Sequence, residues 1–280
     1  MQYCRPRTLE DALSCLSETG WRVLAGGTDV FPASPPSGPD GPILDITAID
    51  SLRGIVRDGG FWSIGAATAW RDVIDAELPS AFDGLQQAAR EVGSPQIQST
   101  ATVAGNICNA SPAADGVPPL LTLDAVVEIA SLAGARRMPL QDFILGNRQT
   151  TLGDGELVTR VLVPETSARG VSSFLKLGAR RYLVISISMV AVRLAIDDGG
   201  RIADAAVSVG ACSEVAQRLP VLEGRLGGLA VSDLQAVRVT SDDLRPLQPI
   251  DDIRATAAYR LDAASEIIHR TVAQAAEGLR

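Results

Sequence analysis

Two glycine-rich segments are the strongest candidates for binding a ligand. The first follows a short apolar run, Val23 to Ala25, and reads Ala25-Gly26-Gly27-Thr28-Asp29. Consecutive glycines let the backbone direct several N–H groups at one place, and such a cluster binds phosphate oxygens. A Gly-Gly turn after a strand is the structural alternative, because glycine-rich loops are common between elements. Neither G-x-G-x-x-G nor G-x-x-x-x-G-K-[ST] occurs, so a nucleotide would not be bound as in Rossmann or P-loop proteins.

The second segment reads Thr102-Val103-Ala104-Gly105-Asn106 and continues into Ala110-Ser111-Pro112-Ala113-Ala114-Asp115. Its hydroxyls, its amide and the bare backbone of Gly105 suit a diphosphate and a ribitol chain. Asp115 could accept a hydrogen bond from a ribose hydroxyl, or it could form an Asx turn or helix cap before Val117. Asn106 could contact a ligand, or it could satisfy buried backbone groups as a loop amide.

The cysteines and the histidine predict no metal site and no catalytic constellation. The four cysteines, Cys4, Cys15, Cys108 and Cys212, show no C-x-x-C spacing, so we expect small buried hydrophobic residues rather than ligands of zinc or an iron-sulfur cluster. The one histidine, His269, lies beside the apolar stripe of a C-terminal helix, so we expect it at the surface or at its rim. A Ser/His/Asp triad elsewhere is therefore excluded.

Composition narrows the class of protein further. The chain has 280 residues, of which 46% are hydrophobic, enough for a substantial core. The formal net charge of −8 argues against nucleic acid as a partner. The longest nearly uncharged apolar run, Val184 to Val192, is too short to cross a bilayer, and the N-terminus lacks the apolar segment of a signal peptide. We therefore expect a cytoplasmic protein without a membrane anchor.

An alternation of helices and strands must position the two glycine-rich segments, both of which are expected to be loops. Thr8 caps a first helix that runs to Leu16, because the apolar residues after it follow a 3.6-residue period. A first domain with an α+β rhythm then ends near Pro164. Its further strands are predicted at 23–25, 43–46, 61–65 and 156–163, with a hairpin of 126–130 and 136–138, and its helices at 70–76 and 79–92.

The C-terminal part of the chain predicts a smaller α+β unit of typical domain size. Three runs favour strands, and a long helix follows them near the end of the chain. The predicted strands cover 174–177, 184–196 and 203–211.

Taken together, these segments make the chain resemble the FAD-binding (medium) subunits of the molybdenum hydroxylases, the family of xanthine dehydrogenase and of the carbon monoxide dehydrogenase flavoprotein. The resemblance covers the full length of the chain, and the order and spacing of the two glycine-rich motifs make it specific. The matching segments are AGGTD at 25–29, TVAGNICNASPAAD at 102–115, YCRPRTLEDAL at 3–13, GELV at 155–158, FLKLGARRYLVISISMVAV at 174–192 and Tyr259-Arg260.

The resemblance implies an α+β fold with a two-subdomain FAD-binding domain of the vanillyl-alcohol-oxidase (PCMH) type. This domain would cover residues 1–168, with subdomains at about 1–55 and 56–168. A C-terminal flavoprotein domain with a three-stranded antiparallel sheet would cover residues 169–280.

The resemblance also implies which residues bind FAD. One set would wrap the diphosphate: Leu24, Ala25, Gly26, Gly27, Thr28, Asp29 and Val30. Thr102, Gly105 and Asn106, with Ala110 nearby, would bind its other side. Asp115 would hold the ribose, Leu157 would pack near the adenine, and Lys176 would approach the flavin, where a cation stabilises the anionic reduced ring.

The sequence departs from the family pattern at two places. Gln98-Ser99 stands where many relatives have Arg-Asn, and Ala104 replaces the second glycine of the T-x-G-G-N motif. Neither change removes a main-chain donor. Arg180, Arg181 and Tyr182 fit a basic segment of the family near the flavin or a subunit boundary, without an assigned role.

The function implied by the resemblance is electron transfer within a heterotrimeric molybdenum hydroxylase. A large partner would bind molybdopterin, a small partner would hold 2Fe-2S clusters, and FAD in this chain would pass electrons to NAD+, dioxygen or another acceptor. Two alternatives stay open: a free-standing flavin-dependent oxidase or reductase on the same fold, and a non-catalytic nucleotide-binding scaffold.

Overall fold

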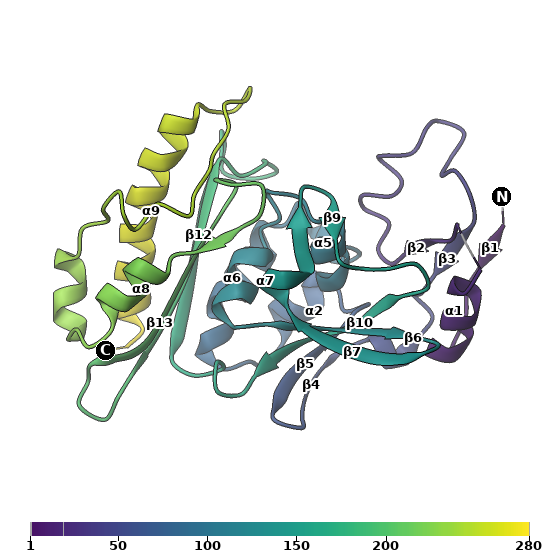
Figure 1. Cartoon of the computed structure of the whole chain (residues 1–280), viewed down its shortest axis with the longest axis horizontal. Helices are drawn as coiled ribbons and strands as arrows, with labels where there is room; N and C mark the ends of the chain where they lie inside the picture. The colour runs from purple at the N-terminus through teal and green to yellow at the C-terminus, as the bar shows by residue number, and fades with distance from the viewer. Residues whose placement is uncertain (1, 19, 280) are drawn as a thin grey trace.

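A computed structural model of the chain describes residues 2–18 and 20–279. The three larger sheets follow one another along the long axis of the molecule (Figure 1), with the N-terminal sheet at one end and the C-terminal sheet with its helices at the other. The two glycine-rich segments belong to the first two of these layers.

The N-terminal sheet is parallel, in the order β1-β3-β2, and is packed against helix α1. As predicted, Thr8 caps α1, because its side-chain oxygen accepts a 3.1 Å hydrogen bond from the N–H of Asp11. Leu13 and Leu16 of α1 are buried against Leu44, which fixes the helix on the sheet. The elements are β1 (Tyr3–Cys4), α1 (Leu9–Leu16), β2 (Arg22–Leu24) and β3 (Ile43–Asp45).

The central sheet is antiparallel, in the order β4-β5-β10-β6-β7, and includes the predicted hairpin of β6 and β7. Helices cover it and bury Trp70, Phe82 and Phe143 in the largest apolar core. The strands are β4 (Ile55–Asp58), β5 (Phe61–Gly65), β6 (Val126–Ser131), β7 (Gly134–Pro139) and β10 (Leu157–Pro164), with a small separate pair of β8 (Ile144–Gly146) and β9 (Gln149–Thr150). The α-helices are α2 (Trp70–Asp75), α3 (Asp83–Glu91), α4 (Pro95–Gln98), α5 (Val103–Asn109), α6 (Val117–Thr122) and α7 (Leu140–Phe143), and short 3-10 turns lie at Asp50–Leu52 and Ser80–Phe82.

The C-terminal sheet consists of three long antiparallel strands and a short strand, β14, added at one edge. Helix α9 packs on β11 and β12, with Ile268 and Val272 in the second apolar core. His269 is half-buried on this helix. The elements are β11 (Val171–Leu177), β12 (Ser188–Ile196), β13 (Ile202–Gly210), β14 (Gln217–Arg218), α8 (Pro220–Leu226), a 3-10 turn at Val231–Ala236 and α9 (Ala257–Glu277).

Two predicted elements were wrong in detail. The strand expected over 184–196 begins only at Ser188, after Leu183 adopts a left-handed φ of 52° that breaks extended pairing. Residues 103–109 form helix α5 rather than a loop, because the side-chain oxygen of Thr102 caps the N–H of Gly105 at 3.0 Å. Small residues there serve close helix packing, which composition alone does not distinguish from a loop.

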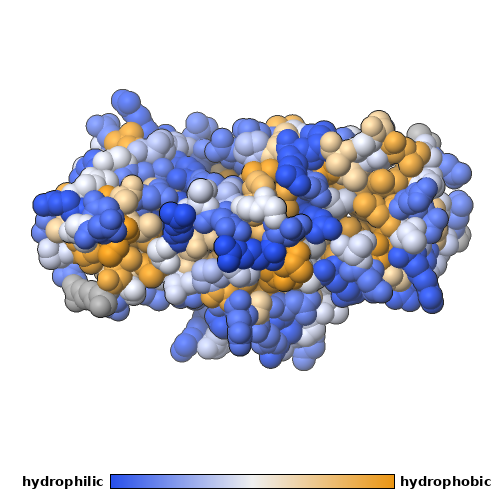
Figure 2. Space-filling view, turned by 90° about the horizontal axis from the view of Figure 1, so that it is seen from below, coloured by the Kyte–Doolittle hydropathy of each residue, from blue (hydrophilic) through white to orange (hydrophobic). Residues whose placement is uncertain are grey.

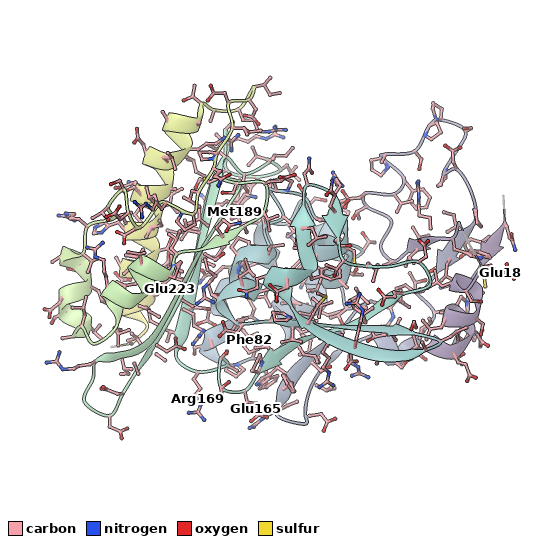
Figure 3. All side chains as sticks on the ribbon, viewed as in Figure 1. Glu18, Phe82, Glu165, Arg169, Met189 and Glu223 are labelled. Carbon is pink, nitrogen blue, oxygen red and sulfur yellow. The ribbon has the colours of Figure 1, made fainter. Side chains whose placement is uncertain are left out.

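A small apolar cluster joins the central part to the C-terminal sheet. It contains Ala88 of α3 with Phe174, Met189 and Ala191 of the sheet. Figure 3 locates Met189 and Phe82 at this boundary. The outer face seen from below is predominantly hydrophilic, with apolar residues gathered in separate patches (Figure 2). None of the helices within residues 2–18 and 20–279 has both the length and the hydropathy of a membrane-spanning segment.

Candidate functional site

The loop that follows β2 meets the first turn of α5, and a cavity of about 420 Å³ lies between them. The predicted residues of both glycine-rich segments line this cavity together, although more than seventy residues separate them in the chain. The predicted residues in the lining are Ala25, Gly26, Gly27, Thr28, Asp29, Val30, Thr102, Gly105, Asn106 and Leu157. The structure therefore places most of the predicted binding residues around one cavity.

Gly26 brings the loop and the segment before α5 into direct contact. A Cβ atom on Gly26 would lie 1.8 Å from the carbonyl oxygen of Thr100 and 2.9 Å from the Cα of Ala101, so no side chain fits there. Gly27 has a φ of +72°, and a Cβ on it would meet the ring of Phe31 at 2.6 Å. Both glycines are thus required by close packing and by backbone conformation.

The loop offers free main-chain donors to the cavity. Among the backbone hydrogen bonds of the described residues, none uses the N–H groups of Gly26, Gly27, Thr28 or Asp29. Of the described residues that line the cavity, none is a lysine or an arginine. An anionic ligand here would therefore be bound chiefly by main-chain N–H groups.

Two buried polar atoms beside the cavity have no hydrogen-bond partner among the described residues. They are Oδ1 of Asn106 and Nε1 of Trp70, and both residues line the cavity. A Cβ on Gly116 would lie 2.3 Å from the Trp70 ring and 2.9 Å from Asn106 Oδ1, so the chain closes tightly around both groups. Because buried polar groups are normally paired, an acceptor and a donor stand ready for a polar ligand.

Cys108 also lines the cavity, and burial raises the pKa of its thiol to about 12. At neutral pH this thiol is protonated and acts as an apolar wall. No group of three His, Cys, Asp or Glu side chains that could hold a metal gathers in the part of the chain that the structure describes.

Asp115 and Lys176 lie outside this cavity and pair with each other. Lys176 Nζ donates to Asp115 Oδ2 at 2.7 Å, and the hydroxyl of Ser186 donates to Asp115 Oδ1 at 2.6 Å. Burial raises the pKa of the Asp115 carboxyl, while the charge of Lys176 and the hydrogen bonds oppose this shift. The sequence predicted separate roles for these residues, with Asp115 at the ribose and Lys176 at the flavin. In the structure the two side chains are in direct contact.

The remaining two predicted residues, Leu24 and Ala110, do not line the cavity but belong to β2 and to the end of α5, next to residues that do. Leu24 is buried in β2. Ala110 ends α5 with a left-handed φ of 46°, and its carbonyl oxygen accepts a 2.9 Å hydrogen bond from the N–H of Arg148. The guanidinium of Arg148 donates to Asn109, another residue in the lining.

The two departures from the family pattern have structural accounts. The buried Gln98 amide donates to the carbonyl oxygen of Arg90 at 3.0 Å. The exposed Ser99 hydroxyl donates to the carbonyl oxygen of Pro95 at 2.8 Å. Ala104 lies inside α5, where no positive φ is needed and its methyl group is accommodated.

The basic segment after β11 is exposed. Arg180 donates to the carbonyl of Leu183, and the guanidinium of Arg181 lies 5.1 Å from the centre of the Tyr182 ring. Neither contact points to a catalytic role.

Several lining residues were missed by sequence reasoning. Trp70, Val92, Cys108 and Asn109 reach the cavity from three different helices or their ends. The side chains of Trp70, Val92 and Cys108 are typical of a core, and only Asn109, a polar residue inside the second motif, gave a signal for a binding site.

Comparison with known proteins gives the family. Residues 1–166 match the FAD binding domain in molybdopterin dehydrogenase, and residues 173–275 match the CO dehydrogenase flavoprotein C-terminal domain. Together these two matches cover nearly the whole chain.

Individual relatives agree with this assignment. The nicotinate dehydrogenase FAD-subunit of Eubacterium barkeri is 32% identical over 71% of this chain and 70% of its own length. The nicotine 6-hydroxylase medium subunit of Paenarthrobacter nicotinovorans is 27% identical over 98% of this chain and 97% of its own. A chain of reconstituted CO dehydrogenase from Oligotropha carboxidovorans superposes with a TM-score of 0.85 at 25% identity, covering 99% of this chain and 98% of that one.

With the cavity of free main-chain donors between two glycine-rich segments, these matches show that the chain belongs to the FAD-binding (medium) subunits of the molybdenum hydroxylase family of oxidoreductases.

Proposed function

We propose that this chain is the electron-transfer subunit of a heterotrimeric molybdenum hydroxylase, in which its FAD takes electrons from 2Fe-2S clusters of a small partner. The electrons originate at a molybdopterin centre in a large partner and leave to NAD+, dioxygen or another acceptor. The observation that carries the proposal is the cavity between the 25–30 loop and α5, where N–H groups and polar side chains that have no partner among the described residues converge.

The residues present fit FAD in three respects. The main-chain N–H groups of Gly26 to Asp29 can bind the diphosphate without a basic side chain. Asn106 Oδ1 and Trp70 Nε1 supply a buried acceptor and a buried donor. Leu157 provides an apolar wall, for which an aromatic ring system is the natural contact.

The Asp115–Lys176 pair is proposed to lie at the flavin end of the cofactor as one unit. The side chain of Lys176 is only 6% exposed, so its charge acts in a poorly solvated environment. Asp115 and Ser186 orient this ammonium group. When bound, FAD supplies the redox chemistry, and Lys176 holds a fixed positive charge beside it.

The relatives support the assembly. The nicotine 6-hydroxylase and carbon monoxide dehydrogenase relatives are named as a medium subunit and a medium chain, which implies larger and smaller partners. Within the described residues no metal-ligating cluster is present, so we place both metal centres in the partners. We also propose, as the sequence predicted, that the complex is cytoplasmic.

The test is reconstitution. The purified chain is expected to be yellow and to release FAD on denaturation, but to oxidise no N-heterocycle or aldehyde on its own. Co-purification from the native cell is expected to yield two partners with molybdenum and iron, and the complex is expected to reduce the flavin when substrate is added.

Other outcomes would support the alternatives. Substrate oxidation by the isolated chain would indicate a free-standing flavoenzyme, and absence of flavin would indicate a scaffold. Absence of molybdenum and iron from every co-purifying protein would overturn the proposal.

A further inference from the structure

The N-terminal sheet brings two of the cysteines together. Cys4 lies on β1 and Cys15 in the last turn of α1, and their Sγ atoms are 3.0 Å apart. Both residues are only half-buried. Cys108 and Cys212 lie elsewhere, in the cavity wall and beside Ser188.

The geometry suits a covalent bond between these sulfurs better than a shared metal. Among the described residues no third His, Cys, Asp or Glu completes a metal site with them. The sulfurs already share a hydrogen bond, so the two side chains point at each other.

We propose that Cys4 and Cys15 form a reversible intramolecular disulfide, a modification site that ties the first strand to the first helix. The oxidant is a small-molecule disulfide, for which oxidised glutathione is the probe. Cys4 attacks one glutathione sulfur, which forms a mixed disulfide and releases one glutathione thiol. Cys15 then attacks Cys4 and releases the second thiol, so the protein loses two hydrogens and two electrons and the oxidant gains both.

The environment of the sulfurs supports this order of attack. The hydrogen bond with Cys4 and burial raise the pKa of the Cys15 thiol to about 11, so Cys15 retains its proton at neutral pH. In the proposed order Cys4 makes the first attack, and Cys15 resolves the mixed disulfide once its thiol has released its proton to solvent.

The disulfide would stabilise the sheet that carries the 25–30 loop. Strand β1 is held to the sheet through a two-residue pairing with β3, Tyr3 with Ile43 and Cys4 with Leu44. On the other side of β3, β2 leads directly into that loop. A bond from β1 to α1 would hold the edge of this sheet in place.

The test is a peptide map of the native full-length chain equilibrated in glutathione buffers. After acid quenching, alkylation and trypsin, the expected product is peptide 1–7 (MQYCRPR) joined to peptide 8–22 (TLEDALSCLSETGWR), two hydrogens lighter than the separate pair. Its yield is expected to rise with the oxidised fraction and to fall to zero when reductant is restored. Amide hydrogen exchange at Cys4 and Leu44 is expected to slow at least several-fold in the oxidised form.

The control is Cys15→Ser, in which the mixed glutathione disulfide on Cys4 is expected to accumulate without a joined peptide. Cys108 and Cys212 are expected to stay alkylatable in the unfolded digest of both proteins. Separate alkylation of Cys4 and Cys15 in the wild-type chain at every glutathione ratio would overturn the proposal. So would a joined peptide that forms only in denaturant. The wild-type map decides the matter even if the variant does not fold.

Discussion

Lys176 Nζ lies 2.7 Å from Asp115 Oδ2, and this almost fully buried ion pair joins the C-terminal sheet to the segment between α5 and α6. The two residues come from the two separate family matches along the chain. The pair therefore links the two parts of the molecule at a point next to the second glycine-rich motif.

Removal of one partner of this pair is expected to destabilise the chain strongly. Lys176→Met leaves the Asp115 carboxylate buried without its cation, which costs about 3–5 kcal/mol in the free energy of unfolding. The double variant Asp115→Leu/Lys176→Met is expected to lose less than the sum of the single changes. Denaturant unfolding measures all three.

The matched control for the ion pair is Asp75→Asn, because the Arg71–Asp75 pair is exposed on both sides. It is expected to cost no more than about 0.5 kcal/mol. A loss of similar size in Lys176→Met would contradict the buried role of that pair.

Gly26→Ala is expected to separate the loop from the segment before α5. Its methyl group would lie 1.8 Å from the Thr100 carbonyl oxygen, so the backbone must shift, at a cost of about 1–3 kcal/mol. The shift misplaces the free N–H groups, and FAD affinity is expected to fall at least about tenfold. The flavin-to-protein ratio after purification and a titration of apoprotein with FAD measure the loss.

Gly224→Ala is the matched control for this glycine, because a Cβ there meets nothing within 4 Å and the residue lies inside α8. It is expected to leave flavin content unchanged and to stabilise the chain by about 0.5–1 kcal/mol. Equal flavin content in both variants would refute the packing account of Gly26.

Asn106→Leu is expected to affect FAD binding without weakening the apoprotein. The variant removes an unpaired buried Oδ1, so apoprotein stability should be unchanged or slightly higher. Loss of one ligand hydrogen bond is expected to weaken FAD binding by about 1–2 kcal/mol. Quenching of flavin fluorescence in an apoprotein titration measures affinity, with the exposed Gln141→Leu as reference. A lower apoprotein stability would show that Asn106 has a purely structural role.

Asp252 is expected to stabilise the start of α9 in a pH-dependent manner. Burial raises the pKa of its carboxyl, but the hydrogen bonds from Arg254, Ala255 and Arg260 outweigh burial and hold the pKa well below its usual range. Because the folded value is lowered, the carboxylate stabilises the chain above the unfolded pKa of about 3.9, and this contribution is lost as pH falls through the folded value.

The variant that tests this is Asp252→Asn. It is expected to lose about 1–3 kcal/mol at pH 7, since charge-assisted bonds to the buried Arg260 are lost. The difference from wild type should stay constant down to about pH 5 and shrink below about pH 4. Urea unfolding across this pH range measures it, and a difference that grows in acid would contradict the assignment.

Local sequence signals predicted many of the elements, for identifiable reasons. Thr8 caps α1 because the first N–H groups of a helix have no acceptor within the helix, and its hydroxyl oxygen accepts from the N–H of Asp11. The β6–β7 hairpin forms around Gly134, whose φ of +132° is readily adopted by glycine but not by residues with a Cβ atom. Strand β1 was missed, because its two residues give no period. The domain boundary at residue 168 stays a prediction.

The site was predicted in part. Eight of the predicted lining residues lie in the glycine-rich motifs, where bare backbone and hydroxyls can be recognised from the sequence, and the family resemblance added Val30 and Leu157. Trp70, Val92 and Cys108, which form part of the apolar wall, could not be distinguished from ordinary core residues in the sequence. The pairing of Asp115 with Lys176 was not predicted either, because it depends on how the C-terminal sheet meets the segment between α5 and α6.

The amino-acid sequence alone limited the chemistry available to this protein: two segments of small residues without lysine, arginine or histidine offer main-chain groups, hydroxyls and side-chain amides to a ligand. Only the folded chain shows where those groups converge, which polar atoms have no partner among the described residues, and that the segments bearing Cys4 and Cys15 meet. The physical reason is that local patterns report only a residue's near neighbours along the chain. Contacts between separate elements, whether eleven or seventy residues apart, follow from the packing of whole layers against one another.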